Sequence, residues 1–196
     1  MFNGIIKNTA IIHQIDKNKN YFNLVLKSKV SFSKKEIGSS IACSGTCLTL
    51  INFKKNLSTF YLSKETLNKS NFKYLNKGSL INIEKSMKLG DRISGHFVQG
   101  HVDTICSIKE ISVLGKSWFI NFSMNSKYRN LIVEKGSVAI NGVSLTISKI
   151  FKNSFQIAVI PKTLQLTNLI KLKKKDFVNV EFDVLGKYIN KSLKKL

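Results

Sequence analysis

The sequence predicts an all-β protein built from two tandem antiparallel barrels, one in each half of the chain. Residues 40–49 and 137–146 share Ser, Ala, Gly, Leu and Thr at a constant offset of 97 residues. Each half also holds about six short apolar or alternating segments, separated by hairpin-sized turns and one short helical segment. An offset of 97 residues is far longer than a solenoid repeat of roughly 20–50 residues, so each copy should have its own core.

The repeat extends beyond these two segments and sets the expected domains. The same offset pairs Thr66-Leu67 with Thr163-Leu164, and Asn82-Ile83-Glu84 with Asn179-Val180-Glu181. Glycines and polar residues cluster at 90–95, where one copy should end. The predicted units are a first barrel over residues 1–95, a second barrel over 96–185 and a C-terminal helix over 186–196.

In the first copy, strands are expected where apolar residues run together or alternate. These segments are residues 4–12, followed by a polar turn up to residue 20, then 21–26, 40–43, 48–53, 59–62 and 80–84. Ser44-Gly45 separates two of them and predicts a tight hairpin turn. Residues 66–75 are expected to form a short helix, although their apolar positions are unevenly spaced.

The second copy repeats this order. Its expected strands are residues 102–111, 118–124, 137–140, 145–151, 155–160 and 177–182, with a helical turn near 164–169. Trp118, Ile120, Phe122 and Met124 alternate and should share one face of their strand.

The tail from Gly186 lies outside the repeat. Ile189, Leu193 and Leu196 are spaced i, i+4 and i+7, which predicts an apolar stripe on a lysine-rich helix. Such a stripe packs against another subunit or belongs to a frayed terminal helix, and the sequence leaves both open.

Composition limits the class of protein. A hydrophobic fraction of 43% and 13 Phe residues exclude a disordered chain. No apolar run approaches the roughly 20 residues of a membrane span, and the first residues lack the pattern of a signal peptide. Three cysteines cannot all pair within one chain, which favours reduced thiols and a cytoplasmic location.

The formal charge of +21 raises the question of a nucleic-acid or membrane partner. Among 32 basic residues, however, only Arg92 and Arg129 are arginine, the side chain usually recruited for phosphate recognition. The lysines are spread along the whole chain among many Asn and Ile residues, a bias that favours an A·T-rich genome over a functional basic surface. A single-strand nucleic-acid binder would interleave basic and aromatic residues, and 118–124 is aromatic without being basic. We expect neither partner.

The segment 94–103, Ser-Gly-His-Phe-Val-Gln-Gly-His-Val-Asp, is the richest in chemistry. It brings His96, His101 and a carboxylate to the junction of the copies, with glycines that allow close approach of a ligand. The alternative is a linker with incidental histidines.

Cys43-x3-Cys47 and His96-x4-His101 imitate a metal-ligand set. The second copy has Ile140 and Ser144 at the two cysteine positions, so we expect no metal. Cys43 and Cys106, in apolar strands, should be core residues.

Cys47 and Ser144 occupy equivalent positions after a turn glycine, and each precedes Leu-Thr. No serine-hydrolase arrangement accompanies them. Two similar but unlike positions suggest two similar ligands held in different roles.

With these residues assembled, the sequence resembles the riboflavin synthase α-chain family over nearly its whole length. The matching motifs are Met1-Phe2-x-Gly4-Ile5-Ile6, Gly45-x-Cys47-Leu48-Thr49, Lys64-Glu65-Thr66-Leu67, 95–103, Gly142-Val143-Ser144-Leu145-Thr146 and Ile160-Pro161-x-Thr163-Leu164. Departures are Ser44 where the family usually has Asn, Asn141 where Asp is common and Ser94 where Gly is frequent. Whether Ser44 and Asn141 weaken activity stays open.

The resemblance implies two six-stranded Greek-key barrels and a homotrimer assembled through the C-terminal helices, with lumazine synthase as a possible companion. It implies a cofactor-free dismutation of two 6,7-dimethyl-8-ribityllumazine molecules into riboflavin and 5-amino-6-ribitylaminouracil. One lumazine would bind each barrel, and the reacting pair would meet between neighbouring subunits. The alternative is a lumazine- or flavin-binding protein of the same fold that does not turn over.

The resemblance also implies site residues. The first-barrel pocket would draw on Gly4, Ile5, Ile6, Cys47, Leu48, Thr49, Tyr61, Leu62, Ser63, Lys64, Glu65 and Thr66. The second-barrel pocket would draw on Gly100, His101, Val102, Lys135, Ser144, Leu145, Thr146, Ile160, Pro161, Lys162, Thr163, Leu164 and Gln165. His101 would transfer protons, because an imidazole titrates near neutral pH. Cys47 and Ser144 would contact the reacting rings, with Phe2 packed beside them.

Overall fold

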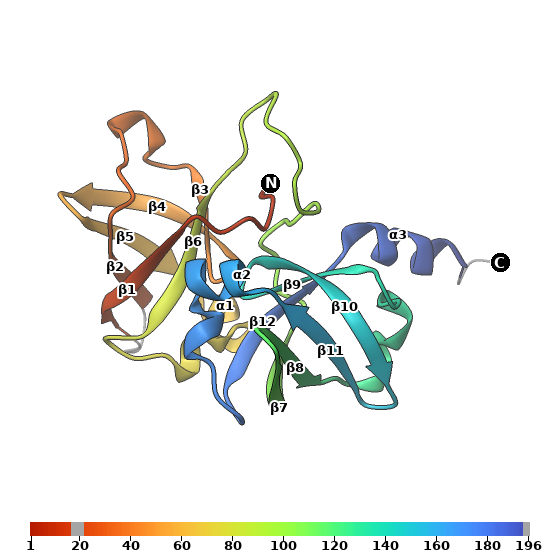
Figure 1. Ribbon diagram of the computed structural model, residues 1–196. Coiled ribbons are helices and arrows are strands. Elements are labelled where there is room, and N and C mark those ends of the chain that lie inside the picture. The colour runs from red at the N-terminus through yellow and green to blue at the C-terminus, as the bar shows by residue number, and fades with distance from the viewer. Residues whose placement is uncertain (17–21, 194–196) are drawn as a thin grey trace.

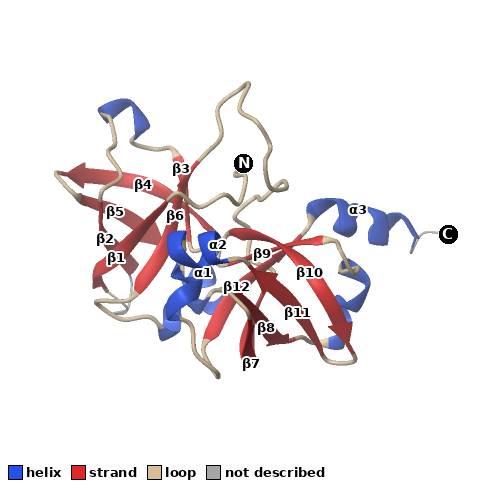
Figure 2. Ribbon diagram, in the orientation of Figure 1, coloured by secondary structure: helices blue, strands red, loops and turns tan. Residues whose placement is uncertain are grey.

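The computed structural model describes residues 1–16 and 22–193 as two six-stranded antiparallel β-barrels in tandem, followed by a C-terminal helix (Figure 1). Short helices lie at the junction of the barrels, and the C-terminal helix projects from the second barrel (Figure 2). The fold class predicted by the repeat is confirmed. None of the described helices is long and apolar enough to cross a membrane.

The first barrel closes in the order β1-β2-β5-β4-β3-β6. Its strands are β1 (Asn8–Ile15), β2 (Phe22–Ser28), β3 (Ser40–Cys43), β4 (Thr46–Lys54), β5 (Leu57–Leu62) and β6 (Leu80–Lys85). Its helical segments are the 3-10 turn η1 (Lys34–Glu36), the helix α1 (Lys64–Lys69) and the 3-10 turn η2 (Asn71–Tyr74). Strands β3, β4 and β5 follow one another as hairpins and β6 returns beside β3, which is the Greek-key arrangement.

The second barrel repeats this topology in the order β10-β11-β8-β7-β12-β9. Its strands are β7 (Thr104–Leu114), β8 (Ser117–Ser123), β9 (Ser137–Ile140), β10 (Val143–Phe151), β11 (Ser154–Val159) and β12 (Phe177–Phe182). Its helical segments are the 3-10 turn η3 (Ser126–Leu131), the helix α2 (Pro161–Leu166), the 3-10 turn η4 (Asn168–Lys171) and the C-terminal helix α3 (Val184–Leu193).

Each barrel has its own apolar core, as a repeat of this length requires. Cys43 is buried in the first core and Cys106 in the second, which confirms both as packing residues. Ile120, Phe122 and Met124 point into the second core with Trp118 packed against it, so the predicted face of β8 is also confirmed.

Among the differences from the sequence prediction, two have a clear physical cause. Strand β1 begins at Asn8 rather than at Gly4, because residues 2–6 leave the first barrel and pack elsewhere. The helix expected over 66–75 is split into α1 and η2, because Ser63 caps α1 and Ser70 caps the second turn. The predicted start of β2 at Tyr21 lies outside the described residues, as does Leu196.

The barrels meet at their equivalent hairpin turns. Ser44 and Gly45 have φ of 43° and 77°, and Asn141 and Gly142 have φ of 46° and 78°, the signature of type I′ turns. A Cβ on Gly45 would lie 2.5 Å from the backbone nitrogen of Gly142, so glycine is required where the turns touch. Asn82 donates to the Asn141 carbonyl at 2.9 Å, and Asn179 donates to the Ser44 carbonyl at 2.8 Å.

Ser44 is therefore an interface residue, and Ser44→Asn is expected to stabilise the protein. Asn tolerates positive φ better than Ser, and Asn141 already fills the equivalent position with its Oδ1 accepting the Asn179 N–H at 2.9 Å. We expect Ser44→Asn to raise the free energy of unfolding by about 0.5–1 kcal/mol, measured by urea denaturation. The matched variant Asn141→Ser should lower it by a similar amount; destabilisation by Ser44→Asn would contradict the prediction.

Candidate ligand-binding sites

Two segments cross between the barrels and pair with each other. The N-terminal segment, residues 2–6, precedes β1, and the junction segment, residues 95–103, precedes β7. Phe2 N donates to Val98 O at 2.7 Å and Val98 N donates to Phe2 O at 3.1 Å. Both side chains are fully buried in a small apolar cluster against which Cys47 packs. The predicted boundary at residue 95/96 falls in this connection and stays a prediction.

One glycine of each crossing segment lies against the barrel to which that segment does not lead. Ser144 N donates to Gly4 O at 2.8 Å, and Cys47 N donates to Gly100 O at 2.8 Å. A Cβ on Gly4 would lie 2.7 Å from Ser144 Cβ, and a Cβ on Gly100 would lie 2.6 Å from Cys47 Cβ. With φ of 72° and 80°, both positions also need glycine for conformation.

This crossing corrects the grouping that the sequence predicted. The segment Gly4–Ile6 belongs with Ser144 and the second barrel, where Ile6 joins the core, and not with Cys47. The segment Gly100–Val102 belongs with Cys47 and the first barrel. The offset of the repeat shows which residues are equivalent, but not on which barrel each segment packs.

Two carboxylates hold the crossing segments in place. Glu84 in β6 accepts the N–H groups of Asn3 at 2.9 Å and Gly4 at 3.1 Å. Glu181 in β12 accepts those of Gln99 at 2.7 Å, Gly100 at 2.8 Å and His101 at 3.0 Å. The sequence offered a signal for these residues in the repeated Asn-x-Glu motif, but no role for them.

His96 also lies at this site, although the family resemblance did not imply it. Its Nδ1 lies 2.7 Å from Ser144 Oγ, its side chain is buried, and its Nε2 has no hydrogen-bond partner among the described residues. Burial lowers the pKa of His96 below 6.5, opposed by the nearby charge of Asp183. The imidazole is therefore neutral at pH 7 and able to exchange a proton with the hydroxyl. Cys47 stands in the first copy where Ser144 stands in the second, so the two sites differ chemically.

The remaining predicted residues of the first barrel divide by burial. Leu48 and Leu62 are core residues, so only their backbone is available to a ligand, whereas Tyr61 and Thr49 are exposed. The rest lie in the first turn of α1: Ser63 caps the helix and accepts the Thr66 N–H at 3.0 Å, and Lys64 and Glu65 are exposed, with Glu65 paired to Lys69 at 2.8 Å.

The second barrel shows the same division. Leu145 and Leu164 are core residues, Thr146 and Ile160 are exposed, and Pro161 is the first residue of α2. Three others also lie in α2: Lys162 and Gln165 are exposed, and the Thr163 carbonyl accepts the Thr167 hydroxyl at 2.8 Å. The side chain of Lys135 is exposed, and its backbone N–H donates to Ile147 O in β10 at 2.9 Å.

Phe2 and His101, both predicted to be catalytic, differ in burial, and neither contacts Ser144 as His96 does. Phe2 is fully buried, so in this structure it supports Cys47 and Val98 rather than facing a ligand. The His101 side chain is exposed next to the Cys47 site, while His96 makes the contact with Ser144. Cys47 is half-buried. The buried thiols are inert by comparison, since burial raises the pKa of Cys106 to about 12 and that of Cys43 still further.

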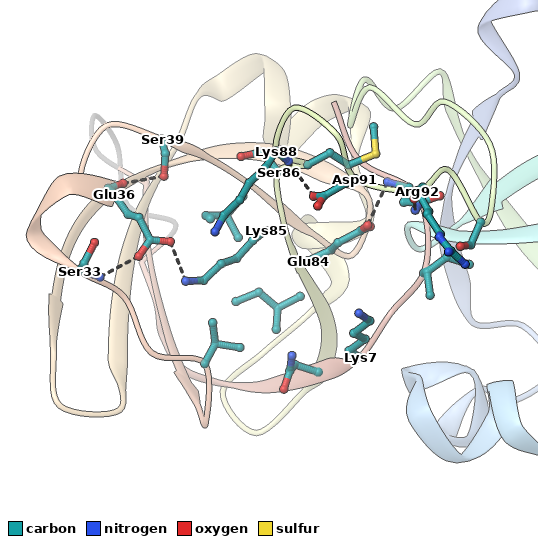
Figure 3. Close-up of a pocket in the computed structure, with 18 residues that line it drawn as sticks. Lys7, Ser33, Glu36, Ser39, Glu84, Lys85, Ser86, Lys88, Asp91 and Arg92 are labelled. Atoms are coloured by element: carbon teal, nitrogen blue, oxygen red, sulfur yellow. Dashed lines mark hydrogen bonds and ion pairs between the residues drawn. The ribbon is translucent and has the colours of Figure 1, made fainter.

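A large open groove lies on the first barrel beside the Glu84 contacts (Figure 3). Its volume is about 950 Å³, and η1, β6 and residues 86–94 line it. The groove holds neither Cys47 nor Ser144, although Ile5 and Glu84 form part of its wall. It is therefore separate from the two glycine-lined contacts, and it gives solvent access to Glu84.

Fold and site together define a duplicated-barrel protein with two related, unlike sites at crossing segments. The lumazine binding domain profile matches residues 3–86 and 99–183. The chain is 35% identical to the riboflavin synthase of Actinobacillus pleuropneumoniae over 195 residues, covering 100% of this chain and 91% of that one. It is 34% identical to the enzyme of Escherichia coli strain K12 over 185 residues, covering 93% and 87%. The chain belongs to the riboflavin synthase and lumazine-binding domain family.

Solved structures agree on the fold. A crystal structure of LumP complexed with riboflavin superposes with a TM-score of 0.82 at 23% identity, covering 93% of this chain and 99% of that one. LumP complexed with 6,7-dimethyl-8-(1'-D-ribityl) lumazine superposes with a TM-score of 0.80 at 22% identity, with the same coverage.

Proposed function

We propose that this chain is a riboflavin synthase, which converts two 6,7-dimethyl-8-ribityllumazine molecules into riboflavin and 5-amino-6-ribitylaminouracil. In this reaction one lumazine loses a proton from its 7-methyl group, the other accepts a nucleophile at C7, and a four-carbon unit is transferred. The observation that carries the proposal is the pair of equivalent sites with different polar groups, Cys47 facing Gly100 and Ser144 facing Gly4 and His96. Two copies of one substrate in two roles need such a pair.

The residues at the second-barrel site suit proton transfer. A neutral His96 at 2.7 Å from Ser144 Oγ can accept a proton from the hydroxyl or return one to it. Ser144 is partly exposed, and its hydroxyl is then the group that meets the ligand. In the first-barrel site, Cys47 and His101 flank Gly100 and would hold the second lumazine. Holding the two rings face to face and excluding water would supply much of the rate.

Incubation with the lumazine alone tests the proposal. Purified protein with no added cofactor should form one riboflavin for every two lumazine molecules consumed, followed by absorbance and fluorescence. Binding without turnover would assign the chain to the non-catalytic lumazine- and flavin-binding proteins of this fold. Absence of binding would refute both functions.

The active assembly is proposed to be a trimer formed through α3. Helix α3 carries apolar side chains that are exposed in the single chain: Tyr188, Ile189 and Leu193 are 69%, 61% and 64% exposed. Burial of such side chains in a three-helix contact would bring the first barrel of one chain next to the second barrel of its neighbour.

Ile189→Glu is expected to convert this trimer into monomers, because a carboxylate cannot be buried unpaired in the contact. Analytical ultracentrifugation measures the change, and Lys191→Glu, a substitution of a polar exposed residue on the same helix, is the control. A wild-type monomer at micromolar concentration would contradict the trimer.

A further inference from the structure

We propose that Glu84 and Glu181 are positioning residues, each of which shapes the ligand site of the barrel opposite to its own. The inference rests on the proposed function for the identity of the ligand. The structural part of the inference does not depend on the ligand: a carboxylate of the barrel to which each crossing segment leads holds that segment against the site of the opposite barrel.

Glu181 anchors the junction segment from the second barrel. The residue is 3% exposed, and its carboxylate accepts three consecutive backbone N–H groups, from Gln99, Gly100 and His101. Consecutive amides converging on one anion form a rigid backbone arrangement, since each bond restricts the same short stretch of chain. The segment that it holds lines Cys47, which belongs to the first barrel.

Glu84 anchors the N-terminal segment in the same way from the first barrel. It accepts the N–H groups of Asn3 and Gly4, and the segment lines Ser144 in the second barrel. Asn3 adds a second anchor, because its side chain donates to Arg92 O and accepts the Gly95 N–H, both at 2.7 Å. Glu84 thus also fixes the position of the residue next to His96.

A short relay of hydrogen bonds connects each carboxylate to its distant site. Glu181 Oε2 accepts the Gly100 N–H at 2.8 Å, and the carbonyl of the same glycine accepts the Cys47 N–H at 2.8 Å. Glu84 Oε2 accepts the Gly4 N–H at 3.1 Å, and Gly4 O accepts the Ser144 N–H at 2.8 Å. Loss of a carboxylate therefore frees a glycine that packs closely against Cys47 or Ser144, so a shift of the segment changes the ligand site.

The two anchors differ in strength. Burial raises the pKa of both carboxyl groups, and their N–H donors oppose this rise. Solvent reaches Glu84 through the groove of Figure 3, and Lys7 lies near its carboxylate. Glu181, in contrast, is buried. Because Glu181 is more deeply buried and accepts its N–H groups at shorter distances, 2.7–3.0 Å against 2.9 and 3.1 Å, its substitution should have the larger effect.

The variants Glu181→Gln and Glu84→Gln test the assignment. An amide keeps the shape of the side chain but replaces one acceptor oxygen with an NH2 group that faces backbone donors. We expect Glu181→Gln to weaken lumazine binding about tenfold at the first-barrel site and less than twofold at the second. Glu84→Gln should show the reverse pattern with a smaller change. Amide NMR signals of Thr49 and Thr146, followed during a lumazine titration, report the two sites separately.

A readout without ligand separates the inference from the proposed function. Hydrogen–deuterium exchange should speed up at residues 99–101 in Glu181→Gln and at residues 3–5 in Glu84→Gln, and in each variant the three amides named for the other should exchange as in wild type. Glu36→Gln is the matched control, because Glu36 also accepts a backbone N–H, that of Ser33, and contacts neither crossing segment.

The assignment is supported if each variant loses lumazine affinity mainly at the site of the opposite barrel and exchanges faster only in the segment that its carboxylate holds. Equal loss at both sites, or loss only at the site of the mutated barrel, would overturn it. If wild-type protein binds no lumazine, the proposed function fails, and the exchange pattern alone still supports or overturns the anchoring.

Discussion

Gly100→Ala is expected to reduce riboflavin formation at least a hundredfold. The new Cβ would lie 2.6 Å from Cys47 Cβ and 2.8 Å from Cys47 N, so the segment and the strand must move apart and the Cys47 N–H loses its acceptor. The φ of 80° adds strain of about 1 kcal/mol for any residue with a side chain. The first-barrel site then loses its wall, and a dismutation that needs two bound substrates stops.

Gly78→Ala provides the control for this substitution. Gly78 has a φ of 90° but no atom within 4 Å of the position of a Cβ, so its replacement carries the backbone strain without the contact. We expect a small loss of stability and unchanged kcat. Steady-state kinetics and thermal unfolding of both variants separate the two effects. Activity of Gly100→Ala within tenfold of wild type would show that the close approach is not needed.

His96→Gln is expected to lower kcat about a hundredfold, the typical contribution of a positioned acid–base group, with little change in KM. Gln can hydrogen-bond to Ser144 Oγ but cannot carry a proton, so binding should survive while proton transfer fails. The exposed His13 lies in β1, and His13→Gln is the control. A loss of tenfold or less in His96→Gln, with a larger loss in His101→Gln, would assign proton transfer to His101.

The same variant should change the pH dependence of stability. The folded-state pKa of His96 lies below the 6.5 of the unfolded chain, so on acidification the unfolded state takes up the proton first. His96 therefore costs stability progressively as pH falls below 6.5, and contributes no pH dependence above it. Urea denaturation between pH 5 and 7.5 should show a smaller decline in His96→Gln than in wild type, and an unchanged decline would contradict a depressed pKa.

The sequence by itself determined the duplicated fold. Strand alternation and the two turn motifs at Ser44-Gly45 and Asn141-Gly142 are local patterns, since side-chain direction and backbone φ depend on neighbours along the chain. Strands β3, β9 and β12 match their predicted bounds, and the equivalence of Cys47 with Ser144 follows from the offset alone.

Only the tertiary structure decided how the two sites are composed. The sequence predicts residues 4–6 as the start of β1, yet they cross to Ser144, where Glu84 accepts the Gly4 N–H and Ile6 is buried in the second core. His96 and His101 lie in one short run, and only burial against Ser144 distinguishes them. Periodicity records which face of a segment is buried; it does not record which barrel buries it, since that depends on contacts between residues 80 or more positions apart.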